Sequence, residues 1–441
     1  MADGYSINWD LYKEAVRDAS TISIQGKVTQ IIGMVIEGKG PGMAIGGLCE
    51  IECKGSQGRV PAEVVGFRDD RVLLMPFGEM RGIDPGSRIR VRHRTLSVKV
   101  GKALLGRVVD GLEFPIDEKG AISFETEYPL YAQPLNPLQR ARISQPLDVG
   151  IRAINGLLTL GKGQRIGIMA GSGVGKSVLM GMIARHTTAD VNVIALIGER
   201  GREVREFIER DLGPEGLKRS VVVVATSDQP ALVRIRGAYL ATAIAEYFRD
   251  LGKDVILMMD SVTRFAMASR EIGLSVGEPP TSRGYTPSVF AVLPRLLERA
   301  GTKTGAGSIT GIYTVLVEGD DMNEPIGDAV RSIVDGHIVL SRDLANQNHY
   351  PAIEMLGSIS RIMPDVTDSA QRKNANKLIS VLATYRKAED LINIGAYVKG
   401  SNPKIDYAIK MIDKVNDYLQ QEVATRASFA ESTARMGSLF G

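Results

Sequence analysis

Residues 168–178 read IMAGSGVGKSV, a glycine-rich loop between two regular elements. The apolar run before it, RIGIM, predicts a strand, and the following SVLMGMIARH predicts a helix. In that order, consecutive backbone N–H groups and a helix N-terminus converge on one place, which suits anionic oxygens. The stretch therefore predicts a phosphate-binding loop on a parallel sheet.

Gly175, Lys176 and Ser177 follow Ala170 at the spacing of the phosphate-loop pattern, with alanine in place of the usual first glycine. Ala170 is expected to end the strand, where a methyl group is tolerated if φ stays negative. Lys176 would neutralise charge on the β and γ phosphates of ATP, and the Ser177 hydroxyl would bind Mg²⁺. A glycine-rich turn without a ligand is the alternative. The residues expected to bind nucleotide here are Gly171, Ser172, Gly173, Val174, Gly175, Lys176, Ser177 and Val178.

Further apolar runs follow the loop and alternate with helical segments. They read VNVIALIG, VVVVA, DVILMMD, IYTVLVE and HIVLS. Short apolar runs joined by helices are typical of an α/β fold whose parallel sheet is covered on both faces. The stretch between the first strands and this region, residues 115–147, is interpreted as linker-like. From about residue 369 the pattern is helical, with Ile405, Ile409, Ile412 and Leu419 expected to form one apolar stripe.

Closely spaced β-rich runs with turn signals between them occupy residues 23–98 and predict a small closed β-barrel. Cys49 and Cys53 are the only cysteines and lack a second pair of zinc ligands, so we expect two reduced, half-buried strand thiols. Ahead of the barrel, residues 7–19 predict a short amphipathic helix around Trp9. That helix either packs on its own protein or docks a partner.

The composition limits the class of protein. The 441 residues include 54 basic and 51 acidic side chains, and the net charge of +3 does not indicate a nucleic-acid-binding protein. Hydrophobic residues at 44% and charged residues at 24% are typical of a soluble globular chain of about three domains. No signal-peptide pattern and no membrane-spanning apolar run are present. We therefore expect a cytoplasmic protein that reaches membranes only through partners.

Two carboxylates follow predicted strands. Asp260 closes VILMMD, where a carboxylate beside the loop would hold Mg²⁺ directly or through water. Glu199 follows VNVIALIG and could orient and polarise the attacking water. A helix-cap contact or a salt bridge with a nearby arginine is an equally good interpretation of Glu199 from spacing alone.

Arginines that stabilise charge on a transferring phosphoryl group cannot be chosen by spacing. The candidates are Arg200, Arg264, Arg342 and Arg361. The four histidines have no partner spacing for a metal site or a catalytic triad, so we assign them no function.

Long stretches of the chain resemble the ATPases of type III protein export, and most closely the flagellar export ATPases, which are related to the catalytic subunits of rotary ATP synthases. The resemblance is carried by GSGVGKS, ALIGERGREVREFIERDLG, VVVATSDQP, DSVTRFAMASREIGLSVGEPPTSRGYTPSVFAVLPRLLERAG and DGHIVLSRDLANQNHYPAIEMLGSISR. It implies a β-barrel over residues 23–95, a RecA-like ATPase domain over 96–368 and a helical domain over 369–441. Residues 1–22 would form an N-terminal arm.

The resemblance also implies roles for single residues. Glu199 would be the catalytic carboxylate of the GER motif and Asp260 the Walker B aspartate. Arg361 would reach into the neighbouring subunit's site, so that the catalytic residues would be Lys176, Glu199 and Arg361. Tyr350 would lie against the adenine of ATP, which suits a flat aromatic face.

The family's assembly implies the partners. We expect a homohexameric ring, a regulatory subunit on the N-terminal helix, and a stalk protein and the export gate at the C-terminal domain. Export substrates and their chaperones would be engaged at the inner face of the cell membrane.

Four rival classes share parts of this pattern. A rotary synthase subunit usually carries a dense acidic stretch in its helical domain, where this chain has YRKAEDLINIG. A virulence-type secretion ATPase shares most motifs, although the GSGVGKS loop favours the flagellar type. A non-catalytic ring subunit would lack Glu199, and the charge argues against an RNA-translocating ring.

Overall fold

This computed structural model describes Trp9 and residues 25–40, 42–54, 58–93, 97–317, 319, 321 and 324–440. The chain divides into two compact units, residues 1–96 and 97–441. The N-terminal helix expected over residues 7–19 lies outside the described residues except for Trp9. None of the helices in these ranges combines the length and apolar character that a membrane span requires.

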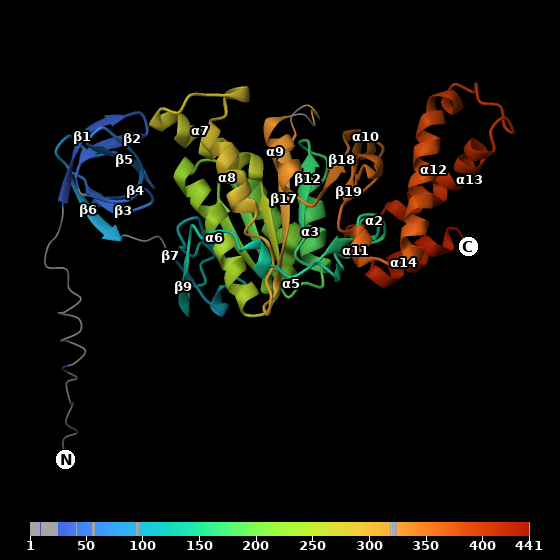
Figure 1. Cartoon of the computed structure of the whole chain (residues 1–441), viewed down its shortest axis with the longest axis horizontal. Coiled ribbons are helices and arrows are strands. Elements are labelled where there is room, and N and C mark those ends of the chain that lie inside the picture. The colour runs from blue at the N-terminus through green and yellow to red at the C-terminus, as the bar shows by residue number, and fades with distance from the viewer. Residues whose placement is uncertain are drawn as a thin grey trace, which may run out of the picture. The chain divides into compact units, whose positions relative to one another are not determined.

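The first unit is a closed antiparallel barrel, which confirms the prediction for this region (Figure 1). Neighbouring strands follow the order β1-β2-β5-β4-β3-β6. Burial alternates along β3, and Ile36, Ile51, Leu74 and Ile89 of the barrel core are fully buried. Its strands are β1 (Gln25–Ile32), β2 (Val35–Lys39), β3 (Leu48–Glu52), β4 (Arg59–Arg68), β5 (Arg71–Pro76) and β6 (Arg88–His93).

Both cysteines are free thiols, as expected, but they are not equally exposed. Cys49 lies on β3 and is buried in the barrel core, and burial raises the pKa of its thiol to about 12. Cys53 follows the end of β3 and is half-buried.

The second unit is built on a mostly parallel sheet in the order β19-β18-β12-β17-β15-β13-β14-β8. Its strands are buried on both faces; all seven residues of β13, VNVIALI, are buried. The strands of this unit are β7 (Ser97–Val100), β8 (Val108–Asp110), β9 (Thr126–Pro129), β10 (Pro146–Leu147), β11 (Leu160–Gly161), β12 (Arg165–Ala170), β13 (Val191–Ile197), β14 (Ser220–Ala225), β15 (Asp254–Asp260), β16 (Gly301–Thr302), β17 (Ser308–Leu316), β18 (Gly336–Leu340) and β19 (Ile359–Ser360).

The helices between these strands cover the sheet in two groups. Connections between parallel strands are right-handed. The chain crosses the sheet in one direction from β12 to β13 and returns in the opposite direction from β14 to β18. The connecting helices of these two passes therefore lie on opposite faces of the sheet. α3, η3 and α5 pack together, and α6 to α9 form the other group (Figure 1). The helices are α2 (Arg152–Leu157), α3 (Lys176–His186), α4 (Gly201–Glu206), η3 (Phe207–Leu212), α5 (Gly213–Lys218), α6 (Ala231–Asp250), α7 (Val262–Val276), α8 (Pro287–Leu297), α9 (Pro325–Ile333) and α10 (Arg342–Asn346), with short 3₁₀ turns η1 (Lys102–Leu104), η2 (Pro137–Gln139), η4 (Ser282–Gly284) and η6 (Met355–Gly357).

Residues 115–147 are a folded part of this unit, so their interpretation as linker-like was wrong. β9 pairs with β7, and Leu130 is fully buried. The Leu130 carbonyl accepts a hydrogen bond from Arg299 at 2.6 Å, and Arg299 is itself paired with Glu246. The stretch is polar and rich in proline, and it contacts segments that are distant in the sequence, so its composition did not indicate these contacts.

The chain ends in helices α11 (Met363–Val366), α12 (Ser369–Asn393), α13 (Pro403–Leu419) and α14 (Phe429–Ser438). Each long helix begins at a side-chain cap: Asp368 for α12, Asn402 for α13 and a Ser428–Glu431 capping box for α14. Their apolar sides join the core of the sheet through α2. We retain residue 369 as the proposed start of a C-terminal helical domain.

The predicted stripe on α13 was right at Leu419, which is buried, but wrong at its three isoleucines. Ile409 is 36% exposed, and Ile405 and Ile412 are only partly buried. The buried side of the helix instead carries Ala408, Met411, Val415, Tyr418 and Leu419. The spacing predicted an amphipathic helix but placed its buried face about one residue off.

Candidate active site

The glycine-rich loop joins β12 to α3, as the sequence predicted. Ala170 is the last residue of β12 and is buried without a positive φ. Gly173 and Gly175 have φ of 78° and 91°, in the left-handed region that glycine tolerates. In the described part of the chain, the N–H groups of Gly173, Val174 and Gly175 donate to no protein acceptor. The loop therefore presents a cradle of N–H donors next to the N-terminus of α3.

A cavity of about 580 Å³ opens over this loop. Every residue from Ala170 to Val178 lines it except Val174. The opposite wall comes from residues at or just beyond the carboxyl ends of β13, β15 and β17, including Glu199, Thr263 and Leu316. Ligands of open parallel sheets bind at this end of the strands.

Lys176 lies between the two carboxylates that the sequence singled out. Its Nζ contacts an Asp260 carboxylate oxygen and lies 3.5 Å from Glu199 Oε1. The three side chains are 4–13% exposed. Burial opposes the charged form of Lys176, but Asp260 and Glu199 together raise its pKa above the usual value. The lysine is therefore a buried cation held by two carboxylates.

Asp260 is fixed by the neighbouring strand. It ends β15 and is 3% exposed, and the Thr314 hydroxyl of β17 donates to its Oδ1 at 2.7 Å. The Thr263 hydroxyl on α7 accepts from the Leu316 N–H at 2.9 Å, which ties the start of α7 to the same strand. The carboxylate is thus held in a buried position where it contacts Lys176, which itself lines the cavity.

Glu199 is a cavity residue with a strongly raised pKa. Burial raises its pKa to about 7 against the opposing charge of Lys176, and the negative charge of Asp260 and a hydrogen bond with the charged Glu203 raise the pKa as well. Glu203 lies one turn further along the chain, lines the same cavity, and accepts a hydrogen bond from Arg200 Nη1 at 2.9 Å. A carboxylate that titrates near neutral pH suits proton transfer.

The four candidate arginines are separated by the structure. Arg200, Arg264 and Arg342 line the cavity, whereas Arg361 lies outside it. The buried Nε of Arg264 has no hydrogen-bond partner among the described residues. Arg361 follows β19 with an exposed side chain, and its N–H donates to the Asp335 carbonyl at 3.0 Å. None of the histidine side chains described lines the cavity.

Tyr350 lines a second cavity of about 280 Å³ on the other side of the loop. A Cβ added at Gly175 would lie 3.5 Å from Tyr350 Cε1, and the ring is 40% exposed. The walls are mainly apolar and include Val178, Met182 and Val423. A flat apolar ring of a ligand fits this environment, next to the phosphate cradle.

Several residues of the candidate site were missed by sequence reasoning. Glu203 follows Glu199 at the i+4 spacing, a signal that is visible in the sequence but was not used. Thr314 lies in an apolar strand and gave no signal. Gln421 and Val423 line the second cavity from more than 240 residues beyond the loop, and only the fold brings them there.

Three family models match the chain. They are the nucleotide-binding domain of the ATP synthase alpha/beta family over residues 150–360, the β-barrel domain of that family over 28–91, and the T3SS EscN ATPase C-terminal domain over 367–438. The flagellum-specific ATP synthase of Bacillus subtilis is 58% identical over 94% of this chain and 95% of its own. The type 3 secretion system ATPase of Xanthomonas euvesicatoria is 52% identical over 92% of each chain.

The chain belongs to the ATP synthase alpha/beta family. Among solved structures, the assembled ATPase EscN of the enteropathogenic E. coli type III secretion system is 47% identical, with a TM-score of 0.89 over 94% of this chain and all of that one. EscN in complex with its central stalk EscO gives a TM-score of 0.87 at 46% identity, over 94% of this chain and all of that one. The similarities place the chain among the P-loop ATP hydrolases of the flagellar and type III secretion branch and confirm the resemblance found in the sequence.

Proposed function

We propose that the chain hydrolyses Mg-ATP with Glu199 as the residue that activates water. The observation that carries this proposal is the position of Glu199, which lies across the cavity from the donor-rich loop, 3.5 Å from Lys176, with its pKa raised to about 7. A ring subunit that only holds nucleotide needs the loop but no such carboxylate. A group of this pKa takes a proton from water more readily than an ordinary glutamate does.

The phosphates would be bound by the loop and by cations around it. The N–H groups of Gly173, Val174 and Gly175 are available as donors. Lys176, released from Asp260, would contact the β and γ phosphates, and the unsatisfied Nε of Arg264 supports a place for this side chain beside them.

The donor set fits Mg²⁺. The Ser177 hydroxyl and the Asp260 carboxylate are hard oxygen ligands, and the rest of an octahedral shell would come from phosphate oxygens and water. Mg²⁺ would neutralise the charge of the phosphates. The hydrogen bond from the Thr314 hydroxyl would hold the Asp260 carboxylate in position to bind the ion.

A binding place for adenine and an arginine that acts on a neighbouring subunit complete the proposed site. Adenine would lie in the apolar cavity against Tyr350, which adjoins the loop at Gly175. Arg361 would act on the site of a neighbouring subunit, which is supported by its exposure and by its absence from the cavity of its own chain. We propose a homohexameric ring as the form in which this happens.

We propose that hydrolysis serves flagellar protein export. The higher identity to the flagellar relative from B. subtilis than to the Xanthomonas secretion ATPase supports the flagellar assignment. By analogy with EscN, which forms a complex with its central stalk, a stalk protein would contact the C-terminal helices. A regulatory subunit on the N-terminal arm, delivery of substrates and chaperones to the export gate, and a cytoplasmic location at the membrane follow from the same family role.

The test is Glu199→Gln. Because the amide keeps the size of the side chain, binding of Mg-ATP should stay within about threefold of wild type, while turnover falls by about 10² to 10⁴. Binding is measured with a fluorescent ATP analogue and turnover by phosphate release. Hydrolysis at the wild-type rate in this variant would remove Glu199 from the mechanism.

A further inference from the structure

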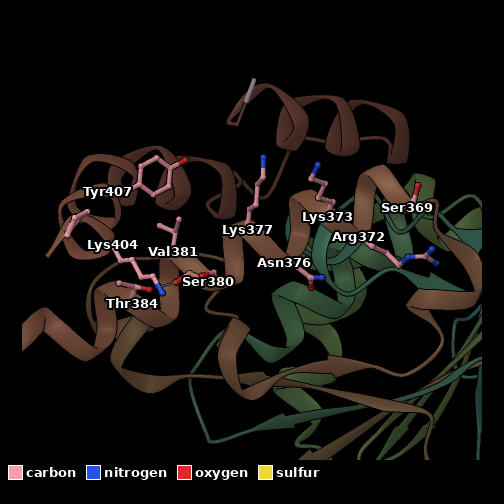
Figure 2. Close-up of a pocket in the computed structure, with 11 residues that line it drawn as sticks. Ser369, Arg372, Lys373, Asn376, Lys377, Ser380, Val381, Thr384, Lys404 and Tyr407 are labelled. Atoms are coloured by element: carbon pink, nitrogen blue, oxygen red, sulfur yellow. Dashed lines mark hydrogen bonds between the residues drawn. The ribbon is translucent and has the colours of Figure 1, made fainter.

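A groove of about 960 Å³ runs along α12 beside the start of α13, away from the residues of the nucleotide cavity (Figure 2). It is formed entirely by the C-terminal helices. Its lining residues are Ser369, Arg372, Lys373, Asn376, Lys377, Ser380, Val381, Thr384, Pro403, Lys404 and Tyr407.

The groove is strongly cationic. Four of its lining residues, Arg372, Lys373, Lys377 and Lys404, carry a positive charge, and none is acidic. No salt bridge joins Lys373, Lys377 or Lys404 to any acidic side chain in the described ranges. Arg386, further along α12, is by contrast paired with Glu354. Uncompensated positive charge along one trough indicates an anionic occupant.

The shape of the groove indicates a helix as that occupant. The α12 residues recur every three or four positions from Ser369 to Thr384, which is one face over about four turns, or about 22 Å. Figure 2 shows Lys373 and Lys377 projecting on the same side of α12, with Lys404 and Tyr407 on α13. A small anion would need a compact site, whereas this length matches about 15 residues of helix.

The groove also has an apolar part. Val381 is buried at its floor, and Pro403 and the 47% exposed Tyr407 line the α13 side. Nucleic acid or a lipid headgroup would pair with the positive charges but would leave the apolar surfaces of Val381, Pro403 and Tyr407 without a contact. An amphipathic helix with acidic side chains beside an apolar row matches both features.

We propose that the α12–α13 groove binds an acidic amphipathic helix of a partner protein. The acidic side chains pair with Lys373, Lys377 and Lys404, and the apolar row packs on Val381 and Tyr407. The inference does not depend on the mechanism of ATP hydrolysis, because no residue of the groove lines either nucleotide cavity.

The test uses a synthetic fluorescent 18-residue peptide with leucine at i, i+3 and i+7 spacing, glutamate flanking that row and alanine elsewhere, titrated into the full chain at low salt. The test variant is Lys373→Glu with Lys404→Glu. Arg372 stays, because it donates to the Thr367 carbonyl at 3.1 Å, and Lys377 stays, because it lies 5.5 Å from the centre of the Phe440 ring. Lys410→Glu with Lys414→Glu is the matched control, since both lysines are exposed on α13 outside the groove.

The proposal predicts that the peptide binds wild type and that the test variant weakens binding by about tenfold or more, whereas the control changes it less than about threefold. A peptide with lysine in place of glutamate should in turn prefer the test variant. Unchanged ATP hydrolysis shows that both variants are folded.

Four results overturn the proposal: equal loss in test and control variants, equal binding of a scrambled peptide of the same composition, loss of ring assembly in the test variant alone, or no peptide binding where anionic phospholipid vesicles or duplex DNA bind. The third would assign the groove to a contact between copies of this chain. The fourth would assign it to a lipid or nucleic-acid surface.

Discussion

Glu199 and Glu203 form a carboxylate pair at the edge of the nucleotide cavity, and their coupling predicts a pH dependence. Glu199 must be ionised to accept a proton, and burial together with the negative charges of Asp260 and Glu203 raises its pKa to about 7. The value of kcat/KM should therefore rise about tenfold per pH unit below pH 7 and level off above it. Steady-state rates between pH 5.5 and 8.5 measure this.

Glu203→Gln provides the matched variant. It removes a negative charge that raises the pKa of Glu199, so the rise in kcat/KM should move to lower pH. An unchanged midpoint would show that Glu203 does not act on Glu199, and the profile of Glu199→Asp would then show whether position 199 titrates at all.

Substitution of Lys176 is expected to lower ATP affinity as well as turnover, unlike substitution of Glu199. Lys176→Ala removes the cation expected to contact the phosphates and leaves Asp260 without its partner. ATP affinity and turnover should fall together, affinity by about tenfold or more. Equilibrium binding and phosphate release on the same preparation measure both. Wild-type affinity in this variant would count against the loop as the phosphate site.

Substitutions on the two sides of helix α13 test which side of it is buried. Met411→Ala should lower the free energy of unfolding of the second unit by about 2–5 kcal/mol, because Met411 is only 4% exposed and its loss leaves a cavity. Ile409→Ala, on the exposed side, should change it by less than about 0.5 kcal/mol. Chemical denaturation followed by circular dichroism compares the two. A larger cost for Ile409→Ala than for Met411→Ala would mean that α13 is buried on the face first predicted from its sequence, and equal costs would contradict the described packing.

The accuracy of sequence reasoning at this level depended on what surrounds each element. The strands β13 and β14 were predictable, because continuous apolar runs are required where both faces are covered. The face of α13 was not, because Ile405, Ile409 and Ile412 fit a helical period as well as the observed row does. The contacts of α13 with α12 and α2 determine which side of the helix is buried, and these contacts are long-range in the sequence.

In the whole molecule, the candidate site was predictable where its residues lie at the ends of strands of one sheet, and not where they come from segments outside that pattern. The loop and Glu199 follow strands of one sheet and Asp260 ends another strand of it, so topology brings them together around Lys176. The second cavity combines the loop with Tyr350 and with Val423 beyond α13, which no local pattern indicates. The trans role of Arg361 came only from the resemblance to the family and lies beyond what one chain contains.

The central claim is a hydrolytic site completed by a neighbouring subunit, and subunit mixing tests it most directly. Arg361→Ala should bind ATP but hydrolyse it about 10³-fold more slowly, and Lys176→Ala should be inactive. In rings mixed one to one, about a quarter of the interfaces pair an intact Lys176 with an intact neighbouring Arg361, so about a quarter of the wild-type rate should return. Mixing Lys176→Ala with the double variant should restore nothing. No recovery in verified mixed rings, or a verified monomer as active as the ring, would contradict the account.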